Sequence, residues 1–172
     1  AERSDPYPGT RFRERGSASI DGIDAGTYDR EAFVRPLASV AADLSIDAID
    51  AAALQMPDGK LPSRAARRMG IDTEAVTAAA TVETLGDTAA ASVPVGLATA
   101  LADGADRVLA AGWGSGAGAN ALLLNREAEV PVSLALDATT EVSYASYLRL
   151  RGEITTPEPE GGGAYVSVPT WR

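Results

Sequence analysis

The chain has 172 residues, enough for one domain with a substantial hydrophobic core. Its formal charge is −9, from 15 basic and 24 acidic residues, which argues against nucleic acid as a partner. The sequence contains no cysteine and no histidine, which excludes disulfides, thiolate nucleophiles, imidazole bases and the usual zinc ligands from this chain. We therefore expect neither a metal site nor a bound cofactor.

The charged residues have an unusual composition. Fourteen of the fifteen basic residues are arginine, and Lys60 is the only lysine. An acid excess with so little lysine suggests a salt-adapted or very GC-rich source, and we predict a halophilic archaeon; the alternative is simply an acidic, soluble surface. Residues 89–102 form the longest weakly polar run, but Pro94 interrupts it and it is too short to span a bilayer. The polar N-terminus has no signal-peptide core. We expect a cytoplasmic protein that does not associate with membranes.

The first half of the chain predicts alternating elements. Residues 1–27 are rich in Gly, Ser, Asp, Arg and Pro, as in an extended arm or surface loop. Apolar residues at helical spacing predict a helix over residues 28–44, which Pro36 would kink. Residues 46–54 predict a strand. A polar turn follows, and Pro62 then opens a short helix that stops at Gly70.

The second half continues this alternation. We predict a buried strand over residues 76–82 and an apolar helix over residues 89–102. The strand signal is clearest at residues 106–112, and a tight glycine-rich turn should pair it antiparallel with residues 120–124. A last helix is predicted over residues 140–151. Residues 157–163 have the composition of a linker.

This order of elements indicates a mixed α/β layer. A crossover over residues 46–82 implies parallel neighbouring strands with a right-handed connection, and the final strand pair adds an antiparallel edge. We therefore expect an arm (1–27), one domain (28–152) and a linker (153–172) that leads toward a following domain.

Three glycine-bearing turns accompany the predicted strands, at residues 55–62, 86–88 and 113–118. Ligands of open α/β sheets gather at the carboxyl ends of the strands. Glycine there allows backbone N–H groups to approach a ligand closely. For any one turn, the alternative is that the turn geometry alone requires the glycine.

Taken together, the three turns resemble those of one family. They are Gln55-Met56-Pro57-Asp58-Gly59-Lys60-Leu61-Pro62, Gly86-Asp87-Thr88-Ala89-Ala90-Ala91-Ser92 and Gly114-Ser115-Gly116-Ala117-Gly118. Hydroxymethylglutaryl-CoA synthases, and more distantly ketoacyl synthase III, carry H-x-P-N-G-K-F-P, G-N-T-x-x-x-S and G-S-G-A-G in the same order. The resemblance covers roughly residues 5–152.

The resemblance implies a thiolase-like C-terminal half: a mixed five-stranded sheet with helices on both faces. In the family, an N-terminal half supplies a nucleophilic cysteine and an acid/base glutamate. The C-terminal half supplies a histidine and an asparagine that hold the thioester oxygen. The implied partners are acyl-CoA as substrate and an N-terminal thiolase-like half or another thiolase-fold chain. We also expect an isolated half to self-associate as a homo-oligomer.

This sequence departs from the family at both catalytic positions. Gln55 stands at the histidine position and cannot carry a proton at neutral pH. Asp87 stands at the asparagine position, where an ionised carboxylate would repel an oxyanion. We interpret Asp87 as a cap of the helix over residues 89–102.

Other positions of the motifs match the family. Lys60 matches a lysine near the CoA entrance, with an ordinary surface charge as the alternative. Gly114, Ser115 and Gly116 would form the bottom of the pocket. Arg64, Arg67 and Arg68 fit a solvated helix face, with a diphosphate clamp as the alternative. Tyr144 and Tyr147 are interpreted as packing residues.

We therefore predict an acyl-CoA-handling half of a condensing enzyme with degenerate catalytic positions, which is inactive alone. The alternatives are a non-catalytic interaction module that pairs with an active thiolase or synthase, and an unrelated α/β binding domain.

Overall fold

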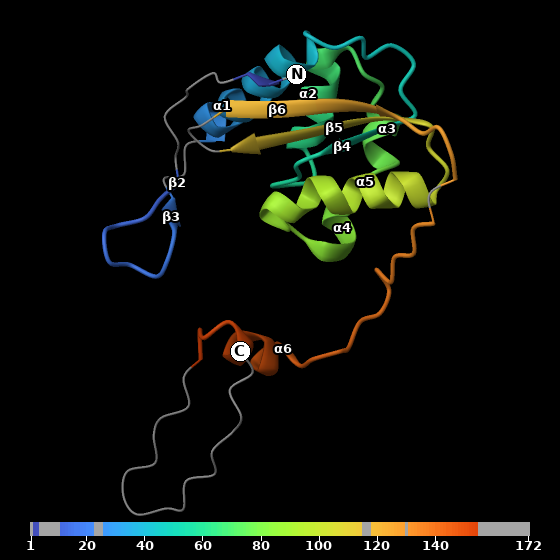
Figure 1. The fold of residues 1–172 in the computed structure, drawn as a ribbon. Coiled ribbons are helices and arrows are strands. Elements are labelled where there is room, and N and C mark those ends of the chain that lie inside the picture. The colour runs from blue at the N-terminus through green and yellow to red at the C-terminus, as the bar shows by residue number, and fades with distance from the viewer. Residues whose placement is uncertain (1, 4–10, 23–25, 115–117, 130, 155–172) are drawn as a thin grey trace, which may run out of the picture. The chain divides into compact units, whose positions relative to one another are not determined.

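The computed structural model describes residues 2–3, 11–22, 26–114, 118–129 and 131–154. The chain divides into two compact units, Ala1–Leu136 and Asp137–Arg172. The first unit contains a layered α/β fold (Figure 1). In the second unit, the described helix is α6 (Tyr144–Leu150), which lies within the helix predicted over residues 140–151.

The main sheet of the first unit has the strand order β1-β6-β5-β4 (Figure 1). β4 (Ala51–Leu54) runs parallel to β5 (Arg107–Gly114), and Leu54 lies opposite Ala111. β6 (Gly118–Asn125) returns antiparallel to β5, and β1 (Glu2–Arg3) pairs with β6 at its edge. The predicted hairpin and the mixed character of the sheet are thereby confirmed.

The prediction of five strands is wrong. The sheet contains three strands of four to eight residues and the two-residue β1. The predicted strand over residues 76–82 is instead occupied by α3 (Thr73–Thr77) and the start of α4 (Val82–Leu85). The Asp72 side chain accepts the Glu74 N–H at 3.0 Å and caps α3. This cap stabilises a helix at the start of the alanine-rich stretch, where a strand was predicted.

The crossover predicted over residues 46–82 is wrong for the same reason, since the parallel strands that the chain connects are β4 and β5. The first of these strands also starts later than predicted, at Ala51 instead of residue 46. Within the predicted N-terminal arm, β2 (Arg11–Phe12) and β3 (Asp21–Gly22) form a separate two-stranded antiparallel sheet.

Helices cover both faces of the main sheet, as predicted (Figure 1). α1 (Gly26–Ala41), α2 (Leu61–Met69) and α3 share one hydrophobic core with the sheet. The opposite face carries α5 (Ser92–Ala102), which follows the short 3-10 turn η1 (Ala89–Ala91). Gly70 adopts φ +76° and ends α2, a conformation that favours glycine.

The alternation of side chains along the strands builds a core on each side of the sheet. Toward α1, Leu54 and Leu109 pack with Phe33 and other fully buried residues of that helix. Toward α5, the buried residues are small, and they include Ala53 and Ala100. Small side chains on this second face allow α5 to lie close to the sheet.

Gly96 marks the closest approach of α5 to β4. A Cβ atom at this position would lie 2.8 Å from the carbonyl oxygen of Ala79 and 3.5 Å from Cβ of Ala53. The first distance is shorter than van der Waals contact, and a backbone carbonyl has little freedom to move away.

We predict that Gly96→Ala lowers the free energy of unfolding by about 1–3 kcal/mol, because overpacking outweighs the helix propensity that alanine adds. Urea denaturation of both proteins measures this difference. Gly59→Ala is the matched control, since a Cβ there meets no atom within 4 Å. An unfolding midpoint of Gly96→Ala equal to that of the control would contradict the close approach.

Candidate functional site

Gln55 directly follows β4 at the carboxyl edge of the sheet. Its backbone N–H donates to the Ala111 carbonyl oxygen at 3.1 Å. Its side-chain Oε1 accepts the backbone N–H of Trp113 at 3.2 Å. The side chain thus extends the pairing of β4 and β5 by one hydrogen bond beyond the end of β4.

Gln55 lies on the α5 side of the sheet. Ala51 and Ala53 of the same strand belong to the core under α5, and side chains alternate along a strand. Gly112 lies on the same side, and a Cβ there would be 3.9 Å from Cγ2 of Val93, in the first turn of α5. The half-buried Gln55 and Gly112 therefore lie on the same face of the sheet, near its carboxyl edge. The first turn of α5 packs on this face beside Gly112.

Trp113 attaches helix α1 to this edge of the sheet. Its indole N–H donates to the Ala32 carbonyl oxygen at 2.7 Å, and its ring meets Phe33 edge to face at 5.5 Å between centroids. Pro36 lies four residues after Ala32 and has no N–H to donate to it. The indole therefore satisfies a carbonyl that the helix itself leaves unpaired.

From the sequence, Trp113 is only the first residue of the glycine-rich turn over residues 113–118, and no separate role is predicted for it. The signal for its role was Pro36, because a proline inside a helix requires an outside donor for the carbonyl four residues earlier. The sequence does not indicate which residue supplies that donor.

The turn that carries Asp87 leads into η1 and then α5. The Asp87 carboxylate accepts the Ala89 N–H at 2.8 Å. Neither η1 nor α5, which begins only at Ser92, has a side-chain cap, so the interpretation of Asp87 as a cap of the helix over residues 89–102 is wrong. Asp87 instead closes a local turn two residues ahead of itself. Ala89 itself has φ +49°, a left-handed conformation that is unfavourable for alanine. The Asp87 hydrogen bond thus helps to hold a strained backbone turn in front of α5.

Lys60 is exposed at the start of α2. The Asp58 carboxylate accepts the N–H groups of Lys60 and Leu61 at 2.6 and 2.7 Å and starts the helix. One exposed stripe of α2, at positions i, i+4, i+7 and i+8, consists of cations; its members are Lys60, Arg64, Arg67 and Arg68. The buried residues of α2 are Pro62, Ala65 and Ala66. Both predicted roles of the arginines, a solvated face and an anion contact, suit this arrangement.

The remaining predicted site residues belong to the hairpin turn. Gly114 ends β5, is exposed and lies opposite Gly118. Ser115 and Gly116 lie outside the described residues. Gln55 and Gly114 therefore lie at the carboxyl edge of the sheet, where β4 and β5 end (Figure 1). The loop to Lys60 begins at the same edge. The Asp87 turn comes directly before η1 and α5.

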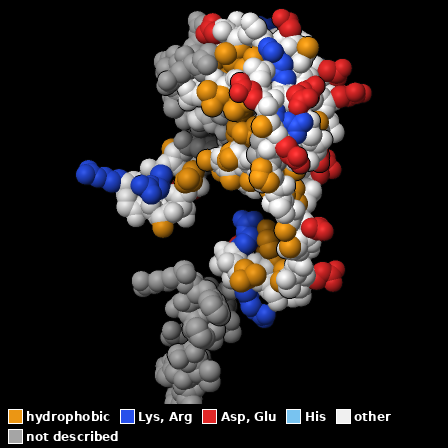
Figure 2. All heavy atoms as spheres, turned by 45° about the vertical axis from the view of Figure 1, so that its right-hand side comes forward, with side chains coloured by type: hydrophobic (Ala, Val, Ile, Leu, Met, Phe, Trp, Pro, Cys, Tyr) orange, Lys and Arg blue, Asp and Glu red, His pale blue; other side chains and the backbone are white. Residues whose placement is uncertain are grey.

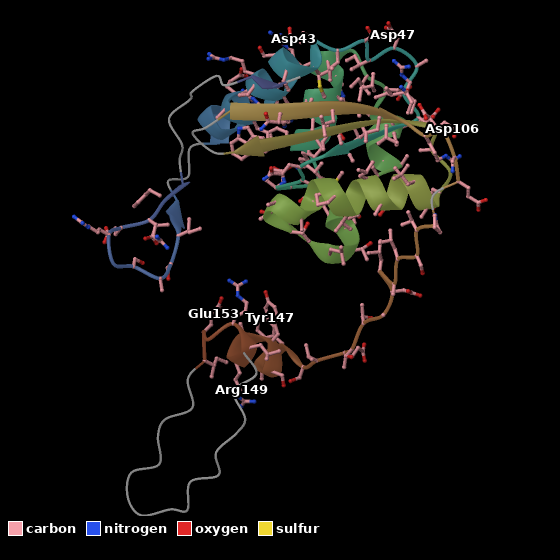
Figure 3. All side chains as sticks on the ribbon, in the orientation of Figure 1. Asp43, Asp47, Asp106, Tyr147, Arg149 and Glu153 are labelled. Atoms are coloured by element: carbon pink, nitrogen blue, oxygen red, sulfur yellow. The ribbon has the colours of Figure 1, made fainter. Side chains whose placement is uncertain are left out.

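At the other end of the sheet, where β4 and β5 begin, acidic side chains take part in hydrogen bonds and an ion pair that hold the strands together. The Asp50 carboxylate accepts the N–H groups of Asp106 and Arg107 at 3.0 and 2.8 Å, and Arg126 donates to Asp106 at 2.7 and 2.9 Å. An open hollow of about 310 Å³ borders on Asp103 here. In Figure 3, Asp106 lies at this end, away from the tips of β4 and β5. Within the described residues, no group of His, Cys, Asp or Glu could hold a metal ion.

In the second unit, α6 carries an exposed aromatic pair. The rings of Tyr144 and Tyr147 stack at 6.3 Å between centroids, and Arg151 lies over the Tyr147 ring at 5.7 Å. Both tyrosines are exposed and α6 has no buried residue, so the interpretation of the two as packing residues is wrong. The hydrogen bond to the Tyr147 hydroxyl and the nearby Glu153 carboxylate raise the pKa of Arg151. Tyr147 and Arg149 project from different sides of α6 (Figure 3).

This mixed α/β layer, with helices on both faces, is that of a thiolase-like C-terminal domain. Residues 40–126, half of the chain, match the family described as 3-oxoacyl-[acyl-carrier-protein] synthase III C terminal. The chain belongs to this family.

Similar proteins include several hydroxymethylglutaryl-CoA synthases. That of Methanothermobacter thermautotrophicus is 32% identical over 121 residues, which cover 64% of this chain and 35% of the relative. That of Aeropyrum pernix is 31% identical over 121 residues, 64% of this chain and 34% of the relative. The Methanopyrus kandleri synthase is 38% identical over 81 residues, 46% of this chain and 23% of the relative. The chain spans about a third of the length of the first two. Among the described residues, none of the helices has the length and apolar character needed to cross a membrane.

We predict that Trp113→Phe lowers the free energy of unfolding by about 1–3 kcal/mol, because the Ala32 carbonyl loses its donor. The loss should be smaller in a Pro36→Ala background, since the introduced alanine would supply the helical N–H that proline lacks. A double-mutant cycle by urea denaturation measures this coupling. Strictly additive effects of the two substitutions would show that Trp113 does not compensate for Pro36.

A second prediction concerns the turn before α5. Asp87→Ala should cost about 1 kcal/mol of stability, because the Ala89 N–H loses its acceptor. Asp87→Asn, which restores the family residue, keeps a side-chain oxygen acceptor and should stay within about 0.5 kcal/mol of the unsubstituted protein. Thermal unfolding compares the three proteins. Equal stabilities of the alanine and asparagine variants would argue against a stabilising role of this hydrogen bond.

Proposed function

We propose that this chain is the acyl-CoA-handling C-terminal half of a hydroxymethylglutaryl-CoA synthase-like condensing enzyme that acts in the cytoplasm. The observation that carries the proposal is the meeting of Gln55, Gly112 and the first turn of α5 at the carboxyl edge of the sheet. Ligands of open α/β sheets bind at such edges. The similarity to hydroxymethylglutaryl-CoA synthases supports a CoA thioester as the ligand.

The residues present limit what this half contributes to chemistry. Condensation through an acyl-enzyme requires a nucleophile such as a thiolate, and the chain has no cysteine. Gln55 cannot act as a general acid or base at neutral pH, and the Asp87 carboxylate accepts the Ala89 N–H. This half therefore binds and positions the thioester, while a thiolase-fold partner supplies the nucleophile and the acid/base group.

The α2 stripe is suited to the anionic part of such a ligand. Lys60 follows the carboxyl edge by five residues, and the stripe continues along the exposed side of α2. The helix contains no acidic residue. Phosphate groups bind Arg and Lys through charge-assisted hydrogen bonds, so we assign the CoA phosphates to this stripe.

The surface for the partner lies on the α5 side of β6. α5 packs over β4 and β5 and leaves Leu122 62% and Leu124 36% exposed on β6. Figure 2 shows a band of apolar side chains exposed on the first unit, bordered by acidic ones. Uncovered apolar sheet surface favours association, so the partner is a thiolase-fold half, and a second copy takes its place when that half is absent.

A non-catalytic interaction module is the second candidate function. It is favoured by the two departures from the family pattern, Gln55 and Asp87, and by the use of the Asp87 carboxylate in a local turn. The two candidates differ in ligand binding, because only the first requires an acyl-CoA site.

We predict that acetoacetyl-CoA binds the chain and that Lys60→Ala/Arg64→Ala weakens binding severalfold at low salt, with a smaller loss at high salt, where charges are screened. Isothermal titration calorimetry measures both effects. Arg13→Ala/Arg15→Ala, which removes two exposed cations from the β2–β3 segment, is the matched control. No heat at millimolar ligand would favour the interaction module.

A further inference from the structure

We propose that two copies of this chain associate through the open edge of β6, which pairs antiparallel with β6 of the second copy about a two-fold axis at Leu124. The sheet would then run continuously through both copies. This inference assigns a strand and a register to the contact between copies, and it does not require acyl-CoA to bind.

The outer edge of β6 is paired over only part of its length among the described residues. β5 pairs with all eight residues of β6 on one side. On the other side, β1 pairs with Ala119 and Asn120. No described strand lies along the rest of this edge. An unpaired edge of this kind is a template for a strand of another chain.

The hydrogen bonds to β5 show which backbone groups of β6 point outward. Directly after β6, the Arg126 N–H donates to the Asp106 carbonyl oxygen at 2.7 Å. Alternate residues of an antiparallel strand face the same neighbour, so Leu124 also exchanges hydrogen bonds with β5. Leu123 and Asn125 therefore direct their backbone N–H and C=O groups away from β5. Among the described residues, no backbone group pairs with them there.

These two outward-facing residues define the register of the contact. Leu123 of each copy exchanges both backbone hydrogen bonds with Asn125 of the other copy, because only outward-facing residues can form such a pair. The two-fold axis then passes beside Leu124, and both copies use the same surface. β1 keeps its place, because β6 of the second copy ends at its own Asn125, before it reaches the part of the edge that β1 covers.

The side chains of β6 suit a contact between two copies. Leu122 is 62% exposed and Leu124 36% exposed. The two-fold axis brings the Leu124 side chains of both copies together as a non-hydrogen-bonded pair, in which side chains lie closest. The chain carries a charge of −9, but β6 itself contains no charged residue. Pairing of the two strands therefore places no like charges opposite each other, and a second copy is the partner that this edge fits.

Asn125→Pro tests the backbone contact. Proline has no N–H, and at this outward-facing position its introduction removes no hydrogen bond to β5. We expect sedimentation equilibrium to show dimers of the unsubstituted chain at submillimolar concentration, and Asn125→Pro to raise the Kd of the dimer about tenfold or more. Asn125→Ala is the matched control, because it removes the same side chain and keeps the N–H. Its Kd should stay within about twofold of that of the unsubstituted chain.

Amide hydrogen exchange gives a second readout that needs no substitution. The N–H groups of Leu123 and Asn125 should become protected as the protein concentration rises, because the second copy supplies their acceptors. The N–H group of Leu124 faces β5 and should be protected at every concentration. Association through a face of the sheet would not produce this alternation along β6.

Three results would overturn the inference. The first is a chain that stays monomeric at millimolar concentration. The second is an equal Kd of the dimer for Asn125→Pro and Asn125→Ala. The third is a dimer in which exchange at Leu123 and Asn125 does not depend on concentration, since the copies would then meet elsewhere. Failure of acetoacetyl-CoA to bind would contradict the proposed function and leave this inference in place.

Discussion

The parallel pairing of β4 and β5 is the constraint on which the rest of the structure depends. β4 has only four residues, and a side chain extends its pairing at each end. Before the strand, the Asp50 carboxylate accepts two N–H groups at the start of β5; after it, Gln55 Oε1 accepts the Trp113 N–H. A four-residue parallel pair is weak alone, so these contacts fix both its register and the position of its carboxyl edge.

The two helical layers are attached to this pair in different ways. α5 approaches through the absence of a side chain at Gly96, whereas α1 is held by the Trp113 indole at the carbonyl that Pro36 leaves unpaired. Trp113 takes part in both contacts of the edge, because its backbone N–H orients Gln55 while its side chain holds α1. A single residue of β5 therefore both holds α1 on the sheet and orients the side chain that follows β4.

The sequence predicted the elements whose signals are local. Periodic apolar residues indicated α1 and α5, and glycines marked the end of α2 and the turn between β5 and β6. It failed at residues 76–82, where an alanine-rich stretch suits either a buried strand or a helix and the Asp72 cap decides for helix. The family pattern located Gln55 and Asp87, but the orientation of Gln55 depends on Trp113, 58 residues away, and no local pattern contains such a contact.

The central claim is that this half binds an acyl-CoA thioester at the carboxyl edge of the sheet, beside Gln55, Gly112 and the first turn of α5. A crystal structure of the chain with acetoacetyl-CoA tests it most directly. The account predicts that the acyl group lies at this edge, beside Gln55, while Gln55 Oε1 still accepts the Trp113 N–H. An acyl group bound away from Gln55, or a Gln55 side chain that has left Trp113, would contradict it.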